Sequence, residues 1–406
     1  MHHLRTRPAP IAVPAALGVA AALLLSSCSA PDTDPPGASG GPSSTSAKPH
    51  GFVEGASEAS EPQLRLLLAD ADGSVAVHDL LAAETESLDD VPAPEHAATD
   101  GRFLATSDGE RTTIVDGGAW TVDHGDHTHY YDAAARVVGS LDGAGSVTIA
   151  SSESTTTLAW SASGRAVALD RDALGQGEVR ETARVDDAGV LLPLGTLLVS
   201  GDAAGDRVRV LDAAGEPTGV DAACGDPAGG IVTRVGAVIG CADGAVLVTE
   251  DPDGGDPVVE TVGVPAGSTL PRATDFANRT GRPTVAALAG DTGYWLLDTR
   301  ERSWQHVPTD RPLRQVVAVD DTDEHVVALD ADGRVLVWSE GDSAPVTTEP
   351  LVSSAAGATL QLDAQRAYLS DPEESVVHEV DFADDARVAR SIDVPVRPDV
   401  LAEVGR

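Results

Sequence analysis

The segment Leu-Leu-Leu-Ala-Asp-Ala-Asp-Gly-Ser-Val-Ala-Val, at residues 66–77, decides the fold. Apolar residues lie on both sides of an Asp-Gly turn, a pattern typical of two antiparallel strands joined by a tight turn. The segment Leu-Asp-Ala-Asp-Gly-Arg-Val-Leu-Val-Trp repeats this pattern at residues 329–338. The Asp-x-Asp-Gly pairs also resemble the start of a calcium loop. Because the remainder of that loop is absent, we interpret them as hairpin turns.

Comparable hairpin units recur along the chain. Most of their successive centres lie about 36 to 49 residues apart, at Gly73, Gly109, Gly145, Gly205, Gly244, Gly293, Gly333 and Pro372. This period suits a four-stranded propeller blade, in which such a turn joins the two middle strands. We therefore predict an all-β protein, a β-propeller of seven or eight four-stranded blades; two β-sandwich domains are the alternative. Since aromatic residues make up only 3% of the chain, Leu, Val and Ala must fill the space between blades.

The N-terminal residues have the pattern of an export signal. Arg5 and Arg7 precede an apolar stretch at residues 11–25, which is shorter than the roughly 20 residues that a membrane-spanning helix needs. Leu-Ser-Ser-Cys follows at residues 25–28 and resembles a bacterial lipobox, in which the cysteine receives a lipid. We therefore predict lipidation of Cys28; an ordinary secretory signal cut nearby is the alternative.

Three domains follow from this pattern. We predict a lipoprotein signal peptide at residues 1–27, a disordered tether at residues 28–49 and a β-propeller domain at residues 50–406. The tether is rich in Pro, Gly and Ser and has almost nothing apolar, so it cannot offset its ordering entropy. The expected location is the cell membrane, where the lipid would anchor the protein on the extracytoplasmic face.

The charge of the chain limits its partners. Lys and Arg number 27 against 65 Asp and Glu, a formal net charge of -38. Such a chain is not expected to bind nucleic acid, whose phosphates need a basic surface. Cations and basic partners are favoured, although acidity also serves solubility alone. We expect the protein to be a monomer.

Two cysteines remain once Cys28 is lipidated. Cys224 precedes a Gly-rich turn region and Cys241 ends an apolar segment, so both can lie on neighbouring strands. In an oxidising compartment an even pair predicts a disulfide. A thiolate metal site is the alternative.

The densest histidine cluster reads Asp-His-Gly-Asp-His-Thr-His-Tyr-Tyr, at residues 123–131. His127 and His129 point to the same side of an extended chain, and a turn at the glycine would bring His124 to them. Three imidazoles with an open fourth position suit Zn²⁺, and Asp126 or Asp123 can complete the shell or orient a ring. Cu(II) and Ni(II) rank behind zinc. The alternative is a polar loop that binds metals only weakly.

The other histidines are scattered. His50 and His96 are secondary candidates for a metal contact, whereas His78, His306, His325 and His378 are expected to be structural. The sequence contains no nucleophile elbow, no P-loop and no dinucleotide-binding glycine motif. We therefore expect that the protein is not an enzyme.

Three motifs resemble a known family. They are His-Gly-Phe-Val-Glu-Gly at residues 50–55, the histidine motif at residues 124–131 and Cys-Ala-Asp-Gly at residues 241–244. Together they resemble the AztD-type zinc metallochaperones over residues 49–406. The resemblance implies a β-propeller that holds zinc outside the cytoplasmic membrane and passes it to the solute-binding protein of a zinc ABC transporter. Where the family carries further histidines, this chain has Asp186-Asp187 and Asp226-Pro227.

The expected function is therefore zinc capture by His124, His127 and His129, followed by transfer to that solute-binding protein. Two alternatives stay open. One is a metal-independent propeller that binds another cell-envelope protein. The other is an enzyme of the lactonase or quinoprotein propeller kind, for which the sequence offers no convergent ionisable groups.

Overall fold

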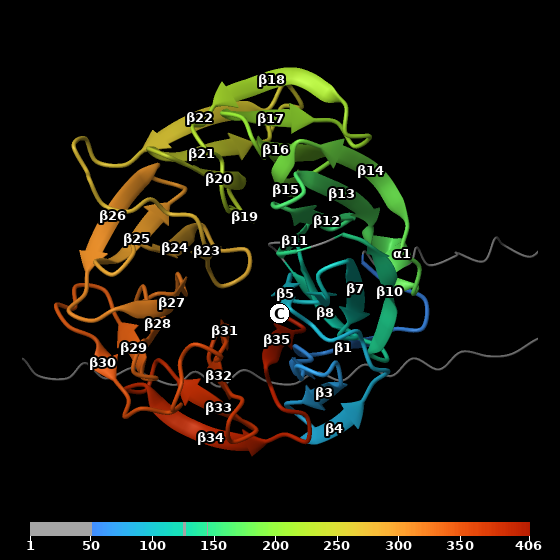
Figure 1. Cartoon of the computed structure of the whole chain (residues 1–406), viewed down its shortest axis with the longest axis vertical. Helices are drawn as coiled ribbons and strands as arrows, with labels where there is room; N and C mark the ends of the chain where they lie inside the picture. The colour runs from blue at the N-terminus through green and yellow to red at the C-terminus, as the bar shows by residue number, and fades with distance from the viewer. Residues whose placement is uncertain (1–50, 125–126, 144) are drawn as a thin grey trace, which may run out of the picture. The chain divides into compact units, whose positions relative to one another are not determined.

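The computed structural model describes residues 51–124, 127–143 and 145–406. Within them the strands form eight four-stranded antiparallel sheets and one three-stranded sheet. The four-stranded sheets follow one another around a ring (Figure 1). The prediction of an all-β propeller is confirmed, with eight blades. The predicted signal peptide, Cys28, the tether and His50 lie outside the described residues.

Blades are numbered along the chain, and their strands are given in sheet order from the centre of the ring outward. Blade 1 contains β35 (Val400–Val404), β2 (Arg65–Ala69), β3 (Val75–Asp79) and β4 (Glu84–Ser87). Blade 2 contains β5 (His96–Thr99), β6 (Phe103–Ser107), β7 (Arg111–Asp116) and β10 (Arg136–Asp142). Blade 3 contains β11 (Val147–Ser151), β12 (Thr155–Trp160), β13 (Arg165–Asp170) and β14 (Glu181–Asp186), with the short helix α1 (Arg171–Gly175) before β14. Blade 4 contains β15 (Ala188–Leu194), β16 (Leu197–Asp202), β17 (Arg207–Leu211) and β18 (Pro217–Ala223).

The second half of the ring repeats this plan. Blade 5 contains β19 (Gly230–Val232), β20 (Ala237–Cys241), β21 (Gly244–Thr249) and β22 (Val258–Gly263). Blade 6 contains β23 (Phe276–Ala277), β24 (Thr284–Leu288), β25 (Gly293–Asp298) and β26 (Ser303–Pro308). Blade 7 contains β27 (Leu313–Ala318), β28 (Val326–Asp330), β29 (Val335–Trp338) and β30 (Val346–Thr347). Blade 8 contains β31 (Leu360–Leu362), β32 (Ala367–Asp371), β33 (Val376–Asp381) and β34 (Arg387–Asp393).

The middle strands are buried on both faces, which explains their continuous apolar runs. Leu66 and Leu68 in β2 pack in one cluster with Tyr368 of blade 8. Leu67, whose side chain points the other way, packs with Leu104 of blade 2. Aliphatic side chains thus make most of the contacts of blade 1 with its two neighbours. Aromatic residues also pack between blades, as Trp160 does between blades 2 and 3 and Trp338 between blades 6 and 7.

The Asp-Gly segments are hairpin turns, as predicted. The Asp70 carboxylate accepts hydrogen bonds from the backbone N–H groups of Asp72 (3.0 Å) and Ser74 (2.8 Å). Asp330 accepts the equivalent pair in blade 7. Gly73 has a φ of 99°, a conformation that favours glycine. A Cβ atom there would also lie 1.9 Å from the carbonyl oxygen of Val91.

One predicted hairpin unit is wrong. Gly145 lies between β10 and β11, which belong to different sheets. The turn of blade 3 lies instead between Trp160 and Arg165, where the N–H of Gly164 bonds to the carbonyl of Trp160 at 3.0 Å. The mistake arose because a connection between blades also needs a Gly-rich turn, so local composition does not separate the two.

The ring is closed by its two ends. The C-terminal strand β35 pairs with β2, with Ala402 opposite Leu67, and becomes the innermost strand of blade 1. The innermost strand of blade 1 is therefore supplied by the end of the chain that lies farthest from its other three strands in sequence.

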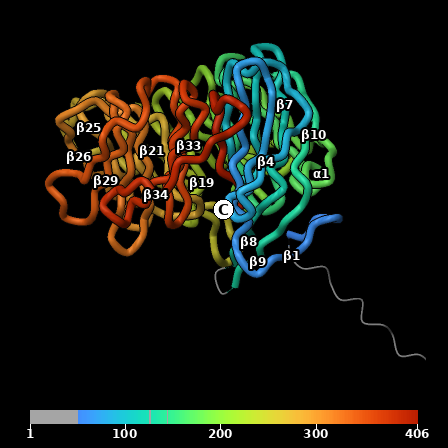
Figure 2. Tube along the Cα trace, turned by 90° about the horizontal axis from the view of Figure 1, so that it is seen from below, coloured from blue at the N-terminus to red at the C-terminus, as the bar shows by residue number. Residues whose placement is uncertain are grey.

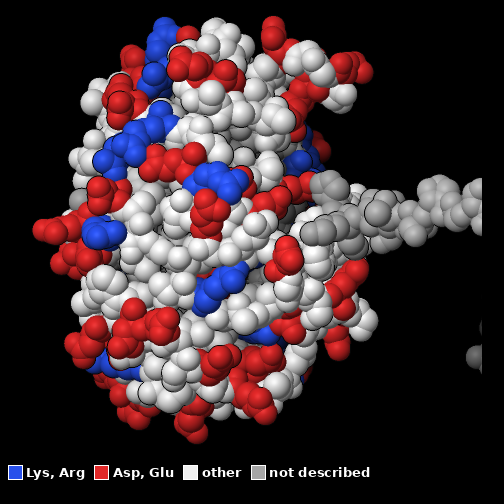
Figure 3. All heavy atoms as spheres, turned by 90° about the vertical axis from the view of Figure 1, so that its right-hand side faces the viewer, with Lys and Arg blue, Asp and Glu red and all other residues white. Residues whose placement is uncertain are grey.

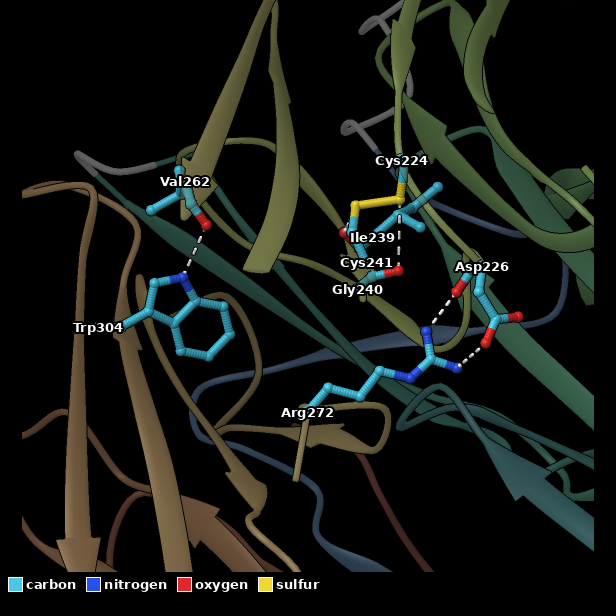
Figure 4. Close-up of a disulfide and its surroundings, with 8 residues drawn as sticks. All are labelled: Cys224, Asp226, Ile239, Gly240, Cys241, Val262, Arg272 and Trp304. Carbon is cyan, nitrogen blue, oxygen red and sulfur yellow. Dashed lines mark hydrogen bonds and ion pairs between the residues drawn. A yellow bond between two sulfur atoms is a disulfide. The ribbon is translucent and has the colours of Figure 1, made fainter. Parts of the chain in front are cut away.

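Cys224 and Cys241 form a disulfide, with an S–S distance of 2.06 Å. Cys224 directly follows β18 of blade 4, and Cys241 ends β20 of blade 5, so the bond joins two neighbouring blades. Figure 4 shows the bond beside the ion pair between Asp226 and Arg272, whose Oδ2 and Nη2 atoms are 2.7 Å apart.

The surface is acidic. Asp and Glu side chains predominate over Arg on the face in Figure 3, consistent with a net charge of -38. In the part of the chain that the structure describes, no helix has the length and apolarity to cross a membrane.

Candidate metal centre

The predicted histidines lie on a hairpin that is inserted into blade 2. Strands β8 (Ala119–Asp123) and β9 (Thr128–Asp132) lie between β7 and β10 in the chain, but they leave the blade. They form the three-stranded sheet with β1 (Ser57–Ala59), which pairs with β9. Figure 2 shows this sheet outside the layer of the blades. We call β8, β9 and their connecting turn the histidine hairpin.

The structure brings the three predicted imidazoles together. The ring centroids of His124 and His127 are 5.0 Å apart, those of His127 and His129 are 4.9 Å apart, and those of His124 and His129 are 5.5 Å apart. One nitrogen from each ring lies within 4.8 Å of the other two. His127 is exposed, while His124 and His129 are half-buried. The cluster can therefore be reached from solvent without any opening of the propeller.

The hairpin turn brings His124 to the other two rings. The backbone N–H of His124 donates to the carbonyl oxygen of His127 at 3.0 Å, and β8 and β9 pair in register from Asp123 opposite Thr128. The predicted ligand Asp126 lies outside the described residues. Among the described residues, no other group of three or more His, Cys, Asp or Glu has its donor atoms converging in this way.

Glu58 is a site residue that the sequence did not reveal. Its Oε1 lies 2.7 Å from Nδ1 of His129, although 71 residues separate them in the chain. The contact arises because β1 pairs with β9 and places Glu58 opposite Tyr131, on the same face as His129. A neutral ring that donates Nδ1–H to this carboxylate presents the lone pair of Nε2, the arrangement typical of a metal-binding histidine.

A column of stacked side chains supports His129. Its ring lies over Tyr131 at a centroid distance of 6.1 Å, and Tyr131 stacks on Trp120 at 5.2 Å. The Arg102 guanidinium lies 3.7 Å from the Trp120 ring centroid. Arg102 also donates two hydrogen bonds, of 3.1 and 2.9 Å, to the buried carboxylate of Asp116. Burial raises the pKa of the Tyr131 hydroxyl, so this ring stays neutral. The column connects the histidines to the rigid interior of blade 2.

The histidine hairpin is held by hydrogen bonds to its backbone at the base and by an ion pair at the tip. At the base, Arg65 of blade 1 donates to the carbonyl oxygens of Gly117 (3.3 Å) and Ala133 (2.9 Å), which flank the two strands. At the tip, Asp123 forms an ion pair with Arg234 of blade 5, with 2.7 Å between Oδ2 and Nη2.

The secondary candidates lie elsewhere. His96 begins β5 and is exposed, and it does not belong to the candidate metal-binding group of the described residues. His78 and His325 are buried, and their Nδ1 atoms contact Thr85 and Asp321 at 2.8 and 2.7 Å, consistent with structural roles. Asp226 is ion-paired with Arg272.

The donor set fits zinc. Zinc holds nitrogen ligands about 2.1 Å away at the corners of a tetrahedron, which places them roughly 3.4 Å apart. The histidine nitrogens lie within 4.8 Å of one another, so the three rings must move closer together to hold the ion. Three imidazole ligands with an open fourth position also favour exchange of a ligand, since a structural zinc site has all four positions closed.

No model of a known protein family matches this sequence, and no curated protein matches it. Among solved structures, AztD from Citrobacter koseri has a similar fold, with a TM-score of 0.72 and 18% sequence identity, covering 85% of this chain and 98% of that one. The apo structure of AztD from Citrobacter koseri gives a TM-score of 0.71 at the same identity and coverage. These similarities show that the chain has the fold implied by the sequence resemblance.

Proposed function

We propose that this protein is an extracytoplasmic zinc metallochaperone of the AztD type, which binds Zn²⁺ through His124, His127 and His129. The observation that carries the proposal is the convergence of three imidazole nitrogens within 4.8 Å. The carboxylate of Glu58 on one of those rings supports it, because nothing about a solubilising His-rich loop requires that contact. The fold shared with AztD supports it independently.

The second part of the proposal is transfer to the solute-binding protein of a zinc ABC transporter. A partner ligand would enter the open position first, after which the imidazoles leave one at a time. The ring of His127 would leave first, since it is the most exposed of the three. The acidic surface would attract zinc and a basic face of the partner. No catalytic step is assigned to the chain, and a lipid on Cys28 would keep it beside the membrane transporter.

Zinc titration with a competing chromophoric chelator tests the binding site. The wild-type protein is expected to bind one zinc ion, and the triple substitution His124→Ala, His127→Ala, His129→Ala is expected to abolish binding at micromolar zinc. His96→Ala removes an exposed histidine outside the cluster and serves as the control. Equal affinity of the triple variant and the wild type would refute the site, and no binding by either protein would favour the metal-independent interaction propeller.

Transfer needs its own measurement. Zinc-loaded protein is mixed with a zinc-free solute-binding protein, and the rate of zinc acquisition is compared with the rate of spontaneous zinc release. Direct handover predicts faster acquisition that rises with partner concentration. Acquisition no faster than spontaneous release would leave a zinc-binding protein without a chaperone role.

A further inference from the structure

The ion pair between Asp123 and Arg234 joins parts of the ring that are not neighbours. Asp123 is the last residue of β8, in the hairpin inserted into blade 2, whereas Arg234 lies between β19 and β20 of blade 5. Blades 3 and 4 separate these two blades along the ring. This ion pair therefore joins the end of β8 to a blade that is not a neighbour of blade 2 in the ring.

Arg234 is held in a rigid turn. The Thr233 hydroxyl accepts hydrogen bonds from the N–H groups of Val235 (3.2 Å) and Gly236 (3.3 Å) and donates to the Gly236 carbonyl at 3.0 Å. Thr233 is itself buried. The Arg234 side chain is 57% exposed and also lines a cavity of about 410 Å³. The turn thus fixes the backbone of Arg234, while solvent reaches its side chain.

The contact at the tip is weaker than the contacts at the base. Thr121 donates to the carbonyl of Gly405 at 2.7 Å, and the Trp120 indole donates to that of Gly51 at 3.1 Å. These bonds involve half-buried groups, whereas Asp123 and Arg234 are 45% and 57% exposed. Because solvent screens exposed ion pairs, we expect the ion pair between Asp123 and Arg234 to be weaker than the half-buried hydrogen bonds of Trp120 and Thr121.

We propose that Arg234 is a positioning residue that latches the tip of the histidine hairpin to blade 5, and that opening this latch presents the histidines to the recipient. The role in transfer rests on the proposed zinc function, but the latch itself does not. All three histidines lie on the hairpin, so opening the latch leaves the ligand set intact. It changes how readily another molecule reaches the ion, not how tightly the ion is held.

Hydrogen exchange of the zinc-free protein tests the latch directly. Arg234→Ala is expected to speed amide exchange in peptides covering residues 119–132 by roughly two- to fivefold, the range that an exposed ion pair supports. The charge swap Asp123→Arg with Arg234→Asp should restore the wild-type rate. Arg207→Ala breaks an equally exposed pair with Asp221 in blade 4 and should leave the hairpin unchanged. Unchanged exchange in Arg234→Ala, an equal rise in Arg207→Ala, or no rescue by the swap would each overturn the latch.

The rate of zinc withdrawal tests the role of the latch in transfer. In Arg234→Ala the zinc dissociation constant should stay within about twofold of the wild type, while EDTA withdraws the ion roughly two- to fivefold faster. A purely structural role would instead change the dissociation constant and the withdrawal rate together, and that result would overturn the positioning role. A wild-type protein that binds no zinc would remove the proposed function, whereas the zinc-free exchange experiment would still decide the latch.

Discussion

The carboxylate of Glu58 contacts the imidazole of His129, with 2.7 Å between Oε1 and Nδ1. The two residues lie on paired strands of a small sheet outside the eight blades. A ring that donates its Nδ1–H to this carboxylate leaves the lone pair of its Nε2 available to a metal ion. The contact thus gives one of the three histidine rings a defined orientation.

The first prediction concerns this contact. Glu58→Ala should weaken zinc binding by about 10- to 100-fold, the usual effect of losing a carboxylate that orients a metal-binding histidine. Glu58→Gln retains an acceptor and should lose less. Competition with a chromophoric chelator measures both, and Glu61→Ala, an exposed neighbour, is the control. Full zinc affinity in Glu58→Ala would show that Glu58 does not orient the ring.

The second prediction concerns the ion pair at the end of the column of stacked side chains that supports His129. Arg102 and Asp116 form an ion pair in which each side chain is only 3% exposed. Asp116→Ala leaves a buried guanidinium without its partner and should lower the free energy of unfolding by about 3 to 5 kcal/mol. Urea denaturation measures this loss. Arg207→Ala, which breaks an exposed pair, should have little effect, and a similar effect of both substitutions would contradict the prediction.

The third prediction concerns how the stability of the fold depends on pH through Glu403. Glu403 is fully buried in β35, and burial raises its pKa well above the usual value, although Arg406 opposes the shift. A carboxyl whose pKa is raised in the folded state binds more protons there than when unfolded. Its contribution to stability is therefore complete below the unfolded pKa of about 4.3 and is lost as the pH rises toward the folded pKa.

Glu403→Gln tests that sign. The amide is neutral at every pH, so the variant should lose less stability than the wild type as the pH is raised above about 4.5. Urea denaturation at a series of pH values measures the difference, with the exposed Glu301→Gln as control. Parallel stability curves for Glu403→Gln and the wild type would contradict the assignment.

The fourth prediction concerns the link between blades 4 and 5. Cys224 and Cys241 are 17 residues apart, and a disulfide closing a loop of this length contributes about 3 kcal/mol by limiting the unfolded chain. The double substitution Cys224→Ala, Cys241→Ala should lower the free energy of unfolding by that order and leave zinc affinity unchanged. A large loss of zinc affinity with the fold intact would instead implicate the cysteines in metal binding.

Local patterns were sufficient to predict the fold class. The Asp-Gly turns, with the Asp70 carboxylate bonded to the backbone of its own turn, depend on residues within four positions of one another. The histidine motif was equally local, because a single hairpin turn brings His124, His127 and His129 together. The same locality explains the wrong assignment of Gly145, since a turn within a blade and a turn between blades have the same composition.

The sequence by itself thus determined the all-β class, the repeat, the acidic surface and the three converging histidines. Only the tertiary structure decided the closure of blade 1 by β35, the contact of Glu58 with His129 and the ion pair of Asp123 with Arg234. Each of these joins residues more than 70 positions apart. Neither charge nor hydropathy pairs two particular residues over such a separation, because only the folded arrangement of strands and blades brings them into contact.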